Sequence, residues 1–329
     1  MTAPATLLPL ALLLLATLAG CTPAPESYSA RSQAFSQPLE VTVAGLQQQR
    51  AEAAAHSAIE DLLFIAEVSH PWRPGPLGRT NQLLSFEAEF SANPSILPMI
   101  RLATELERQS DGRYAPALGQ LQQLWGFHSD PPQGEVPAAE AISDILKARP
   151  RMEDIRIEGI RMRSENAAVR IDFGPFAQGY ALDTARERLR DHGVTSARID
   201  NGNAVVVLGE GWRLALPGEA ERRLALQPGE AALTLSREDR SFSDAQGRYH
   251  PYLDPATGYP GRGIDTVTVI DTSAATAAAL AQALMAGGEA QLAAQLQQLR
   301  PKYALVQTED GRTVTTAAMA KRLGAVREE

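Results

Sequence analysis

The hydrophobic and polar positions follow two periods along the chain, one typical of helices and one typical of strands. Within residues 47–67, one helix face would carry the apolar side chains of Ala55, Ile59, Leu62, Leu63 and Ala66. Residues 264–270 instead place β-branched side chains in alternation, as a strand does. Helices are therefore predicted at 47–67, 94–109, 137–148 and 273–287, with a strand-to-helix junction at 172–191.

Shorter alternating runs between these helices predict the strands of the fold. Strands are expected at 39–43, 155–162, 168–173, 196–199, 204–208, 212–216, 232–235, 264–270, 303–307 and 312–315. Prolines and glycines predict loops at 69–81 and 249–260. The order is neither strict βαβ alternation nor all-β. It predicts an α+β fold with mixed or antiparallel sheets and flanking helices, in one large domain or two intimately packed subdomains.

The first residues have the features of a bacterial lipoprotein signal. Residues 7–18 are an apolar run, shorter than the roughly 20 residues that span a bilayer. The run leads to Leu18-Ala19-Gly20-Cys21, the pattern of a lipobox, in which the cysteine thiol carries the lipid. We expect a signal peptide at 1–20, a palmitate-type anchor at Cys21, a flexible tether at 21–38 and a folded domain at 39–325. The alternative is an ordinary cleaved signal with an incidental cysteine.

Composition narrows the partners and the chemistry. The formal net charge of −8 argues against nucleic acid or an anionic membrane surface as a partner. Cys21 is the only cysteine, so the domain has no thiol for a disulfide, a metal site or a nucleophile. These features favour a lipid-anchored protein on the periplasmic side of a bacterial envelope membrane.

Residues 172–183 form the first segment with candidate chemistry. A strand would deliver Asp172 to its end, Gly174 would make the turn, and Pro175 suits the first position of a helix. The free N–H groups at that helix N-terminus attract a phosphate or a carboxylate. The alternative is a tight helix–sheet contact in which Asp172 serves as a cap.

Residues 249–260 form the second such segment. This proline-rich loop gathers one imidazole, three phenols and a carboxylate, and His250 has the chemistry of an acid or base near neutral pH. The alternative is a stiff turn in which Asp254 and Thr257 bond the local backbone.

Both segments resemble motifs of the ApbE family, periplasmic and often lipid-anchored flavin transferases. Its members split FAD and attach FMN to a Ser or Thr of a target protein, using a divalent metal. The family's Asp-Leu-Gly-Gly-Ile-Ala-Lys-Gly-Tyr-Ala is similar to residues 172–181, and its Leu-Asp-Pro-x-Thr-Gly-Tyr-Pro matches 253–260. Further similar blocks are Trp72-Arg73-Pro74 to Asn81, Gly112 to Pro116, Leu124 to Phe127 and Gly211-Trp212-Arg213. The resemblance implies an ApbE-like, T-fold-related architecture over most of the chain.

The resemblance also implies which residues hold the flavin. Carried over position by position, FAD would contact Trp72, Arg113, Tyr114, Ala115, Asp172, Gln178 and Tyr252. The indole of Trp72 would stack on a flavin or adenine ring. An envelope flavoprotein is implied as the acceptor, and the inner membrane is favoured as the place of the anchor.

The metal and catalytic positions of the family are altered in this chain. The family's Asp and Thr ligands correspond to Ala278 and Gln282, which are poor ligands for Mg²⁺, and its backbone ligand falls at Pro175. The family's catalytic His corresponds to Pro251, and a one-residue gap would make His250 the catalytic imidazole. FAD is therefore the expected cofactor, whereas Mg²⁺ is implied by the family but lacks its side-chain ligands.

These residues are consistent with two main functions. The first is an active FAD:protein FMN transferase with an altered metal arrangement. The second is a catalytically degenerate relative that keeps the fold as a flavin-binding or interaction lipoprotein. A structural lipoprotein without a ligand is a third alternative. In the absence of a cation, the residues expected to hold the diphosphate of FAD are Arg73, Arg79, Arg113 and Arg237.

Overall fold

An eight-stranded sheet forms the centre of the structure, a computed structural model that describes residues 27–129 and 131–324. Every neighbouring pair of its strands is antiparallel. In spatial order the strands are β1 (Ser27–Ala34), β2 (Gln37–Ala44), β6 (Ser196–Asp200), β7 (Ala204–Leu208), β10 (Ala231–Ser236), β13 (Ile264–Asp271), β14 (Tyr303–Thr308) and β15 (Thr313–Thr315).

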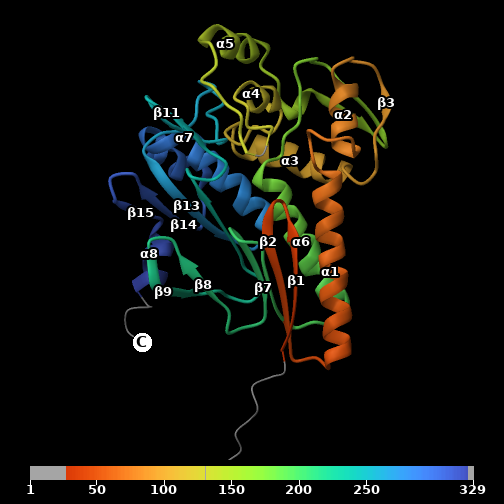
Figure 1. Ribbon diagram of the computed structural model, residues 1–329, viewed down its shortest axis with the longest axis vertical. Coiled ribbons are helices and arrows are strands. Elements are labelled where there is room, and N and C mark those ends of the chain that lie inside the picture. Colours follow the sequence, from red (N-terminus) through yellow and green to blue (C-terminus); the bar gives the residue numbers. More distant parts are fainter. Residues whose placement is uncertain (1–26, 130, 325–329) are drawn as a thin grey trace, which may run out of the picture.

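Three long helices cover one face of this sheet: α1 (Gln48–Val68), α6 (Pro175–Asp191) and α7 (Ala274–Leu299) (Figure 1). The helix α1 packs on β1 and β2, α7 packs on β10 and β13, and α6 lies against both helices. The backbones of α6 and α7 approach closely, because a Cβ at Gly179 would lie 2.4 Å from the carbonyl oxygen of Ala274. Only glycine fits at that crossing.

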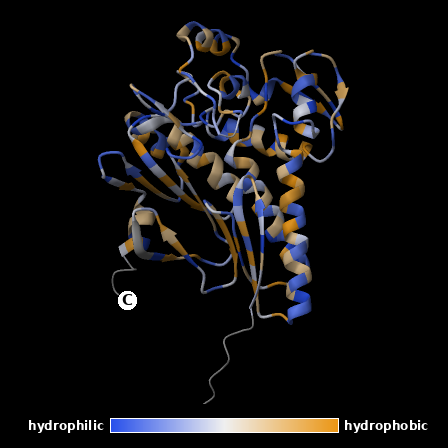
Figure 2. Cartoon of the chain, viewed as in Figure 1, coloured by the Kyte–Doolittle hydropathy of each residue, from blue (hydrophilic) through white to orange (hydrophobic). Residues whose placement is uncertain are grey.

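The opposite face of the sheet is covered by the hairpin of β8 (Arg213–Leu216) and β9 (Glu219–Ala225) and by α8 (Ala317–Gly324). Successive side chains of β7 point to opposite faces of the sheet. Val205 and Val207 pack with this hairpin, whereas Val206 belongs to the main core beneath the long helices. Figure 2 shows the resulting run of hydrophobic colour along the strands. The strands β7, β10, β13 and β14 are therefore buried on both faces.

A second lobe lies beyond one end of the sheet, at the top of Figure 1. Its elements are α2 (Pro76–Leu84), β3 (Phe90–Ser91), α3 (Leu97–Gln109), α4 (Gly119–Leu124), α5 (Ala139–Ala148), the 3₁₀ turn η1 (Met152–Asp154), β4 (Ile155–Glu158), β5 (Arg161–Ser164), β11 (Phe242–Asp244) and β12 (Gly247–Tyr249). One hydrophobic cluster runs from Val41 of the sheet to Met99 of this lobe. The predicted α+β fold with antiparallel sheets is confirmed.

The predicted tether at 21–38 is wrong over its second part. Residues 27–34 form β1, which pairs along its full length with β2, so the folded region begins before residue 39. Burial alternates along β1, but its inward side carries Tyr28 and otherwise only Ala and Ser, so its sequence lacks a strong apolar strand pattern. Residues 1–26, which include the predicted signal and Cys21, lie outside the described residues. In the described part of the chain, no helix combines the length and apolar character needed to cross a bilayer.

The predicted loop at 69–81 and strand at 168–173 also need correction. The loop ends at Gly75, because Pro76 starts α2, a helix position where its missing N–H costs nothing. Residues 168–173 make only one isolated bridge, between Leu118 and Arg170. The side chain of Asn81 bonds both the N–H and the carbonyl of Ile171 at 2.8 Å, and thus replaces a neighbouring strand there.

Three element boundaries differ from the predictions. Residues 155–162 are two strands joined at Gly159, whose φ of 63° reverses the chain. Asn93 begins a turn rather than a helix, and α3 starts at Leu97. The helix expected at 273–287 continues to Leu299 after a break at Gly288, where φ is 64°.

Candidate functional site

A cavity of about 660 Å³ opens between the tip of the β1–β2 hairpin and the second lobe. Its walls come from the hairpin turn at 35–37, the loop at 69–73, the segment 113–119, the start of α6 and the loop at 251–253. Figure 1 shows the hairpin tip directed toward that lobe. The cavity thus lies where the two parts of the fold meet, a common position for ligand sites.

This cavity collects all seven residues that the family resemblance assigned to FAD. The residues are Trp72, Arg113, Tyr114, Ala115, Asp172, Gln178 and Tyr252. They are scattered over most of the sequence, and only the folded chain brings them together. Their contact with FAD stays a prediction.

The indole of Trp72 is held between polar groups at the cavity wall. Its Nε1 donates to Asp172 at 3.1 Å, and the guanidinium of Arg170 lies 4.4 Å from the ring centroid. The ring of His128 meets it edge-on, with centroids 5.6 Å apart. The indole is therefore positioned before any ligand binds, which reduces the entropy that binding would cost.

The turn and the helix start after Asp172 match their sequence prediction, although no strand of the described residues leads into them. The carboxylate of Asp172 accepts from the backbone N–H of Gly174 at 3.0 Å, and Pro175 occupies the first turn of α6. The φ of Gly174 is 55°, and a Cβ there would lie 2.8 Å from Oε1 of Gln282. Glycine therefore lets α6 begin at the cavity wall.

Arg113 and Tyr114, both predicted to contact FAD, have different surroundings in the cavity. The guanidinium of Arg113 donates to the amide oxygens of Gln291 at 2.5 Å and Gln298 at 3.2 Å. The Tyr114 side chain is buried, its ring packs near Phe176, and burial raises the pKa of its phenol well above the usual value. Tyr114 thus forms part of the floor, whereas Arg113 contributes charge.

Gln178 stands where the family has a lysine, and its side chain organises the hairpin side of the cavity. Its Nε2 donates to the side-chain oxygens of Asn201 and Asn203, both at 2.8 Å. Asn201 in turn donates to the carbonyl of Pro38 at 2.9 Å. The donor of Gln178 is thus used within the protein, and its Oε1 remains as the acceptor that a ligand would meet.

Tyr252 has a partner that was not predicted from the sequence. Its hydroxyl donates to Asp239 at 3.0 Å, and burial raises the pKa of both side chains. Asp239 lines the cavity as well, and its carboxylate also accepts from the N–H of Ser236 at 2.8 Å. The sequence signal for Asp239 is weak, because it lies in a turn of mixed charged residues.

The structure contradicts the catalytic role predicted for His250. Its side chain is buried and does not line the cavity. One ring nitrogen bonds the carbonyl of Gly261 at 2.9 Å, and the other accepts from the N–H of Tyr252 at 3.3 Å. Burial lowers the pKa of His250 to about 4. The imidazole therefore supports the 251–261 loop and cannot reach a ligand in the cavity.

The residues at the family's metal positions do not fit a magnesium ion. Ala278 is fully buried and has no donor atom. The Gln282 side chain reaches across to the start of α6, where its Nε2 donates to the carbonyl of Phe173 at 3.4 Å and its Oε1 lies beside Gly174. In the described part of the chain, no group of three His, Cys, Asp or Glu residues is arranged to hold a metal. Alanine thus stands where the family has its charged ligand, and an amide stands where the family has a threonine.

Two further arginines, of which only Arg73 was expected near the diphosphate, and two histidines also line the cavity. They are Arg73, Arg240, His70 and His128. Arg79 lies on α2 outside the cavity, and Arg237 pairs with Asp265 at 3.0 Å and with Glu309 at 3.3 Å. These two arginines are therefore not available to a diphosphate in the cavity. Arg240 was missed because arginines in polar turns are common at protein surfaces.

The sequence is similar to a known protein family and to several curated proteins. The model that defines the ApbE family matches residues 35–306. A curated FAD:protein FMN transferase of Rhodobacter capsulatus is 32% identical over 78% of this chain, and the chain spans about half the length of that relative, 51%. A second FAD:protein FMN transferase, from Vibrio cholerae, is 29% identical over 71% of this chain and 73% of the relative.

Solved structures agree on the fold. The crystal structure of the ApbE protein of Thermotoga maritima matches with a TM-score of 0.80 and 26% identity, over 90% of this chain and 99% of that one. The flavinyl transferase ApbE of Pseudomonas stutzeri matches with a TM-score of 0.79 and 24% identity, over 91% and 98% of the two chains.

Proposed function

The chain belongs to the ApbE family, and we propose that it is an FAD:protein FMN transferase whose acceptor is an envelope flavoprotein. The observation that supports this most strongly is the gathering of all the predicted FAD residues in one cavity of about 660 Å³. That volume lies within the roughly 300–1,000 Å³ usual for small-molecule sites. The names of the Rhodobacter and Vibrio relatives support the same reaction.

The proposed reaction is a phosphoryl transfer. A hydroxyl oxygen of a Ser or Thr on the acceptor attacks the phosphorus on the FMN side of the diphosphate. A new P–O bond forms, the bridging P–O bond breaks, and AMP leaves with the bridging oxygen. The hydroxyl proton passes to a base. Positioning and charge stabilisation account for most of the catalysis in such reactions.

The cavity residues have separate roles in this proposal. The held indole of Trp72 stacks on a ring of FAD, and Oε1 of Gln178 accepts from a ring N–H. The start of α6 and the arginines face the diphosphate. Tyr252 and Tyr114 are buried and shape the wall against which the flavin lies.

A transfer assay tests this function directly. The purified protein is incubated with FAD and a candidate acceptor domain, with and without Mg²⁺ or Mn²⁺. We expect the acceptor to gain the mass of FMN and AMP to appear in equal amount. An acceptor whose target hydroxyl is removed serves as the control. FAD binding without either product under all of these conditions would contradict the transferase and leave a flavin-binding protein.

We also propose that Cys21 anchors the protein by lipid to the periplasmic side of an envelope membrane. The apolar run at 7–18 and the Leu18-Ala19-Gly20-Cys21 pattern support this anchor. The variant Cys21→Ser should move the protein from the membrane fraction to the soluble fraction of the envelope. An unchanged distribution would mean that another feature holds the protein there.

A further inference from the structure

Three arginines and two carboxylates line the cavity, so positive charge is in excess among the described lining residues. Arg73, Arg113 and Arg240 line it, and none of them forms an ion pair within the described part of the chain. The lining carboxylates, Asp172 and Asp239, accept hydrogen bonds from neutral donors instead. Burial also raises the pKa of Asp239. The cavity is thus electropositive in a chain whose formal net charge is −8.

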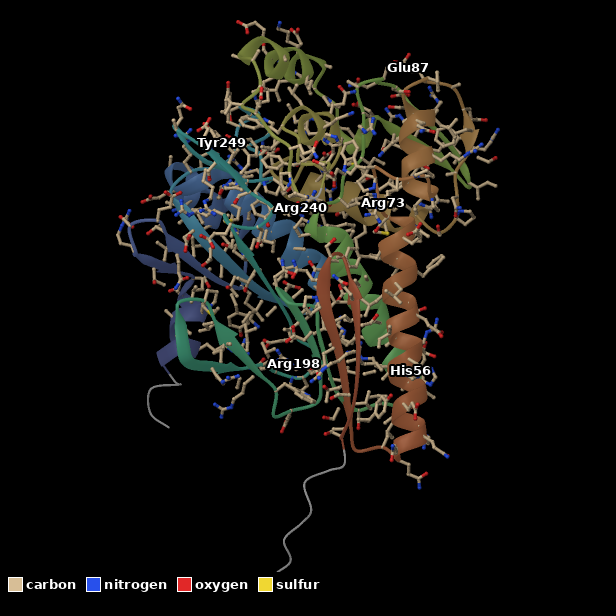
Figure 3. All side chains as sticks on the ribbon, in the orientation of Figure 1. His56, Arg73, Glu87, Arg198, Arg240 and Tyr249 are labelled. Atoms are coloured by element: carbon tan, nitrogen blue, oxygen red, sulfur yellow. The ribbon has the colours of Figure 1, made fainter. Side chains whose placement is uncertain are left out.

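Two of these arginines keep hydrogen-bond donors free for a ligand. Arg240 uses only its Nη2, which donates to the carbonyl oxygens of Phe127 and Ser129, so the side chain is fixed while Nε and Nη1 bond no described residue. Arg73 is exposed and bonds no residue that the structure describes. Figure 3 shows Arg73 and Arg240 above the tip of the β1–β2 hairpin, on either side of it. Their donors are thus available from two sides of the cavity.

The positions that hold a cation in the family supply no comparable charge here. Ala278 lies buried in the core, and the amide of Gln282 is turned toward Phe173 and Gly174. A diphosphate brought into this cavity carries two negative charges and has lost part of its hydration. Unless a cationic group replaces that hydration, binding is strongly unfavourable.

We propose that Arg73 and Arg240 replace the divalent cation of this site and bind the diphosphate of FAD directly. Guanidinium groups suit this role, because their paired N–H donors match two phosphate oxygens. The inference deepens the proposed function, on which it rests, by naming the groups that neutralise the substrate. FAD then binds equally well with and without divalent metal, and the same guanidinium groups stabilise the charge that develops on the departing AMP.

The first test compares FAD affinity in EDTA with FAD affinity in excess Mg²⁺. Titration of FAD with the purified protein, followed by flavin fluorescence, gives both dissociation constants. We expect the two constants to agree. A dissociation constant that rises strongly in EDTA would overturn the proposal, because it would show that a cation still holds the diphosphate.

The second test removes the two guanidinium groups one at a time. Arg73→Gln and Arg240→Gln should each weaken FAD binding about 10- to 100-fold, the loss typical of a charged hydrogen bond. Their affinity for riboflavin, which has no phosphate, should stay at the parent value. Arg240→Lys keeps the charge but loses the planar fork, and its FAD affinity should lie between those of the parent and Arg240→Gln.

The matched control variants replace two arginines that lie close to Arg73 and Arg240 in the sequence. Arg79→Gln on α2 and Arg237→Gln, which is paired with Asp265 and Glu309, should leave FAD affinity unchanged. Equal losses of FAD and riboflavin in the Arg73 and Arg240 variants would overturn the proposal, since they would indicate a disturbed cavity. A protein that binds no flavin in either buffer would instead contradict the proposed function itself.

Discussion

Three histidines near the cavity differ in what their ring nitrogens contact. Both ring nitrogens of His250 are bonded within the buried 251–261 loop. His70 accepts the N–H of Trp72 on its Nδ1 at 3.2 Å, which places its proton on Nε2, and burial followed by the charge of Arg73 lowers its pKa. His128 is exposed, lines the cavity, and makes no hydrogen bond with the described residues. His128 therefore offers the imidazole best able to accept a proton from an acceptor hydroxyl.

Replacing His128 by alanine should slow FMN transfer about 10²- to 10⁴-fold, the usual contribution of a general base, while the affinity for FAD is largely kept. Single-turnover transfer and a flavin titration measure the two effects separately. His56→Ala is the matched control, because His56 is exposed far down α1, outside the cavity, where its ring meets that of Tyr28 edge-on (Figure 3). Equal transfer rates in the two variants would remove His128 from the mechanism.

Trp72 is expected to contribute stacking energy to the bound flavin nucleotide. Trp72→Ala should raise the dissociation constant of FAD by about 10- to 100-fold, since stacking of a base on an aromatic side chain contributes about 1–3 kcal/mol. Flavin fluorescence titration measures this change. Trp212→Ala, at the hairpin on the opposite face of the sheet, is a control that should leave FAD affinity unchanged. No difference between the variants would place FAD elsewhere.

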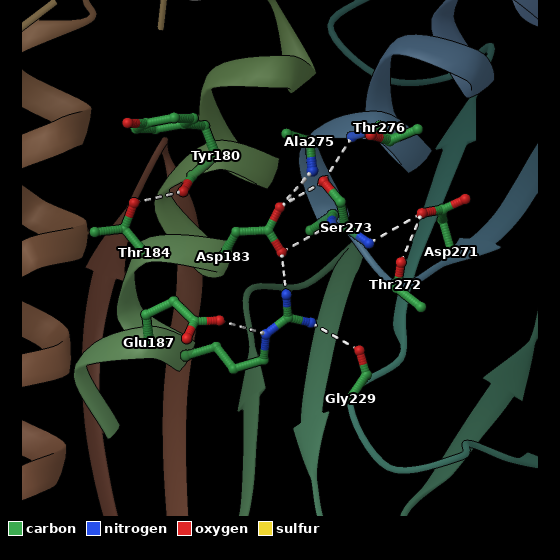
Figure 4. A network of polar contacts seen from close by, with 12 residues as sticks. Tyr180, Asp183, Thr184, Glu187, Gly229, Asp271, Thr272, Ser273, Ala275 and Thr276 are labelled. Atoms are coloured by element: carbon green, nitrogen blue, oxygen red, sulfur yellow. Dashed lines mark hydrogen bonds and ion pairs between the residues drawn. The ribbon is translucent and has the colours of Figure 1, made fainter. Parts of the chain in front are cut away.

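At the scale of elements, one carboxylate joins α6 to the start of α7 (Figure 4). Asp183 of α6 accepts from the hydroxyl of Ser273 at 2.8 Å and from the N–H groups of Ala274 at 2.9 Å and Ala275 at 3.0 Å. It also pairs with the buried Arg186 at 3.0 Å. Asp183 thus satisfies free donors at the N-terminus of α7 and holds the two helices in register above the sheet.

Asp183→Ala should lower the free energy of unfolding by about 3 kcal/mol, because it removes the acceptor of the Ala274 and Ala275 N–H groups and leaves the buried Arg186 with the Gly229 carbonyl but without its carboxylate partner. Urea unfolding followed by circular dichroism measures the loss. Asp191→Ala, at the exposed end of the same helix, should change stability by less than about 0.5 kcal/mol. Similar losses in both variants would show that the α6–α7 contact depends on packing alone.

At the scale of the whole molecule, two buried groups give stability opposite dependences on pH. Burial raises the pKa of Glu107 to about 7 and lowers that of His250 to about 4. The contribution of Glu107 is present at acidic pH and is lost as pH rises through about 7. The contribution of His250 is present above pH 6.5 and is lost as pH falls toward 4. The two effects partly cancel between pH 4.5 and 6.5.

Glu107→Gln should separate these effects, because glutamine keeps the bond from the N–H of Met152 at 2.8 Å but carries no charge. We expect the variant to be more stable than the parent by up to about 3 kcal/mol at pH 8 and equally stable near pH 4.5. Urea midpoints across this range measure the difference. Glu105→Gln, at a half-exposed residue of the same helix that pairs with Arg108, controls for the substitution. A difference that is constant with pH would contradict a buried, shifted carboxyl at Glu107.

Much of the fold could be predicted because the sequence patterns that indicate its helices and strands involve only residues close together in the sequence. Strands β2, β6, β7, β10, β13 and β14 follow apolar alternation, and α1, α6 and α7 follow apolar periodicity or caps that need only a few neighbouring residues. The segment 168–173 shows where this fails, because it alternates like a strand but pairs with no full strand. The side chain of Asn81 bonds the backbone of Ile171, and on the other side the backbone bonds only the short segment 116–119. The missing partner strand is a property of distant residues.

The sequence by itself determined the α+β class and the family motifs from which Trp72, Asp172 and Gln178 were assigned to the flavin. Only the tertiary structure decided that His250 is buried, that Gln282 reaches across to Phe173 and Gly174, and that Arg240 joins Arg73 at the cavity. The physical reason is that some properties depend on residues close in the sequence and others on residues far apart in it. Periodicity and turns depend on neighbours along the chain, whereas accessibility and charge environment depend on which distant segments the fold packs together.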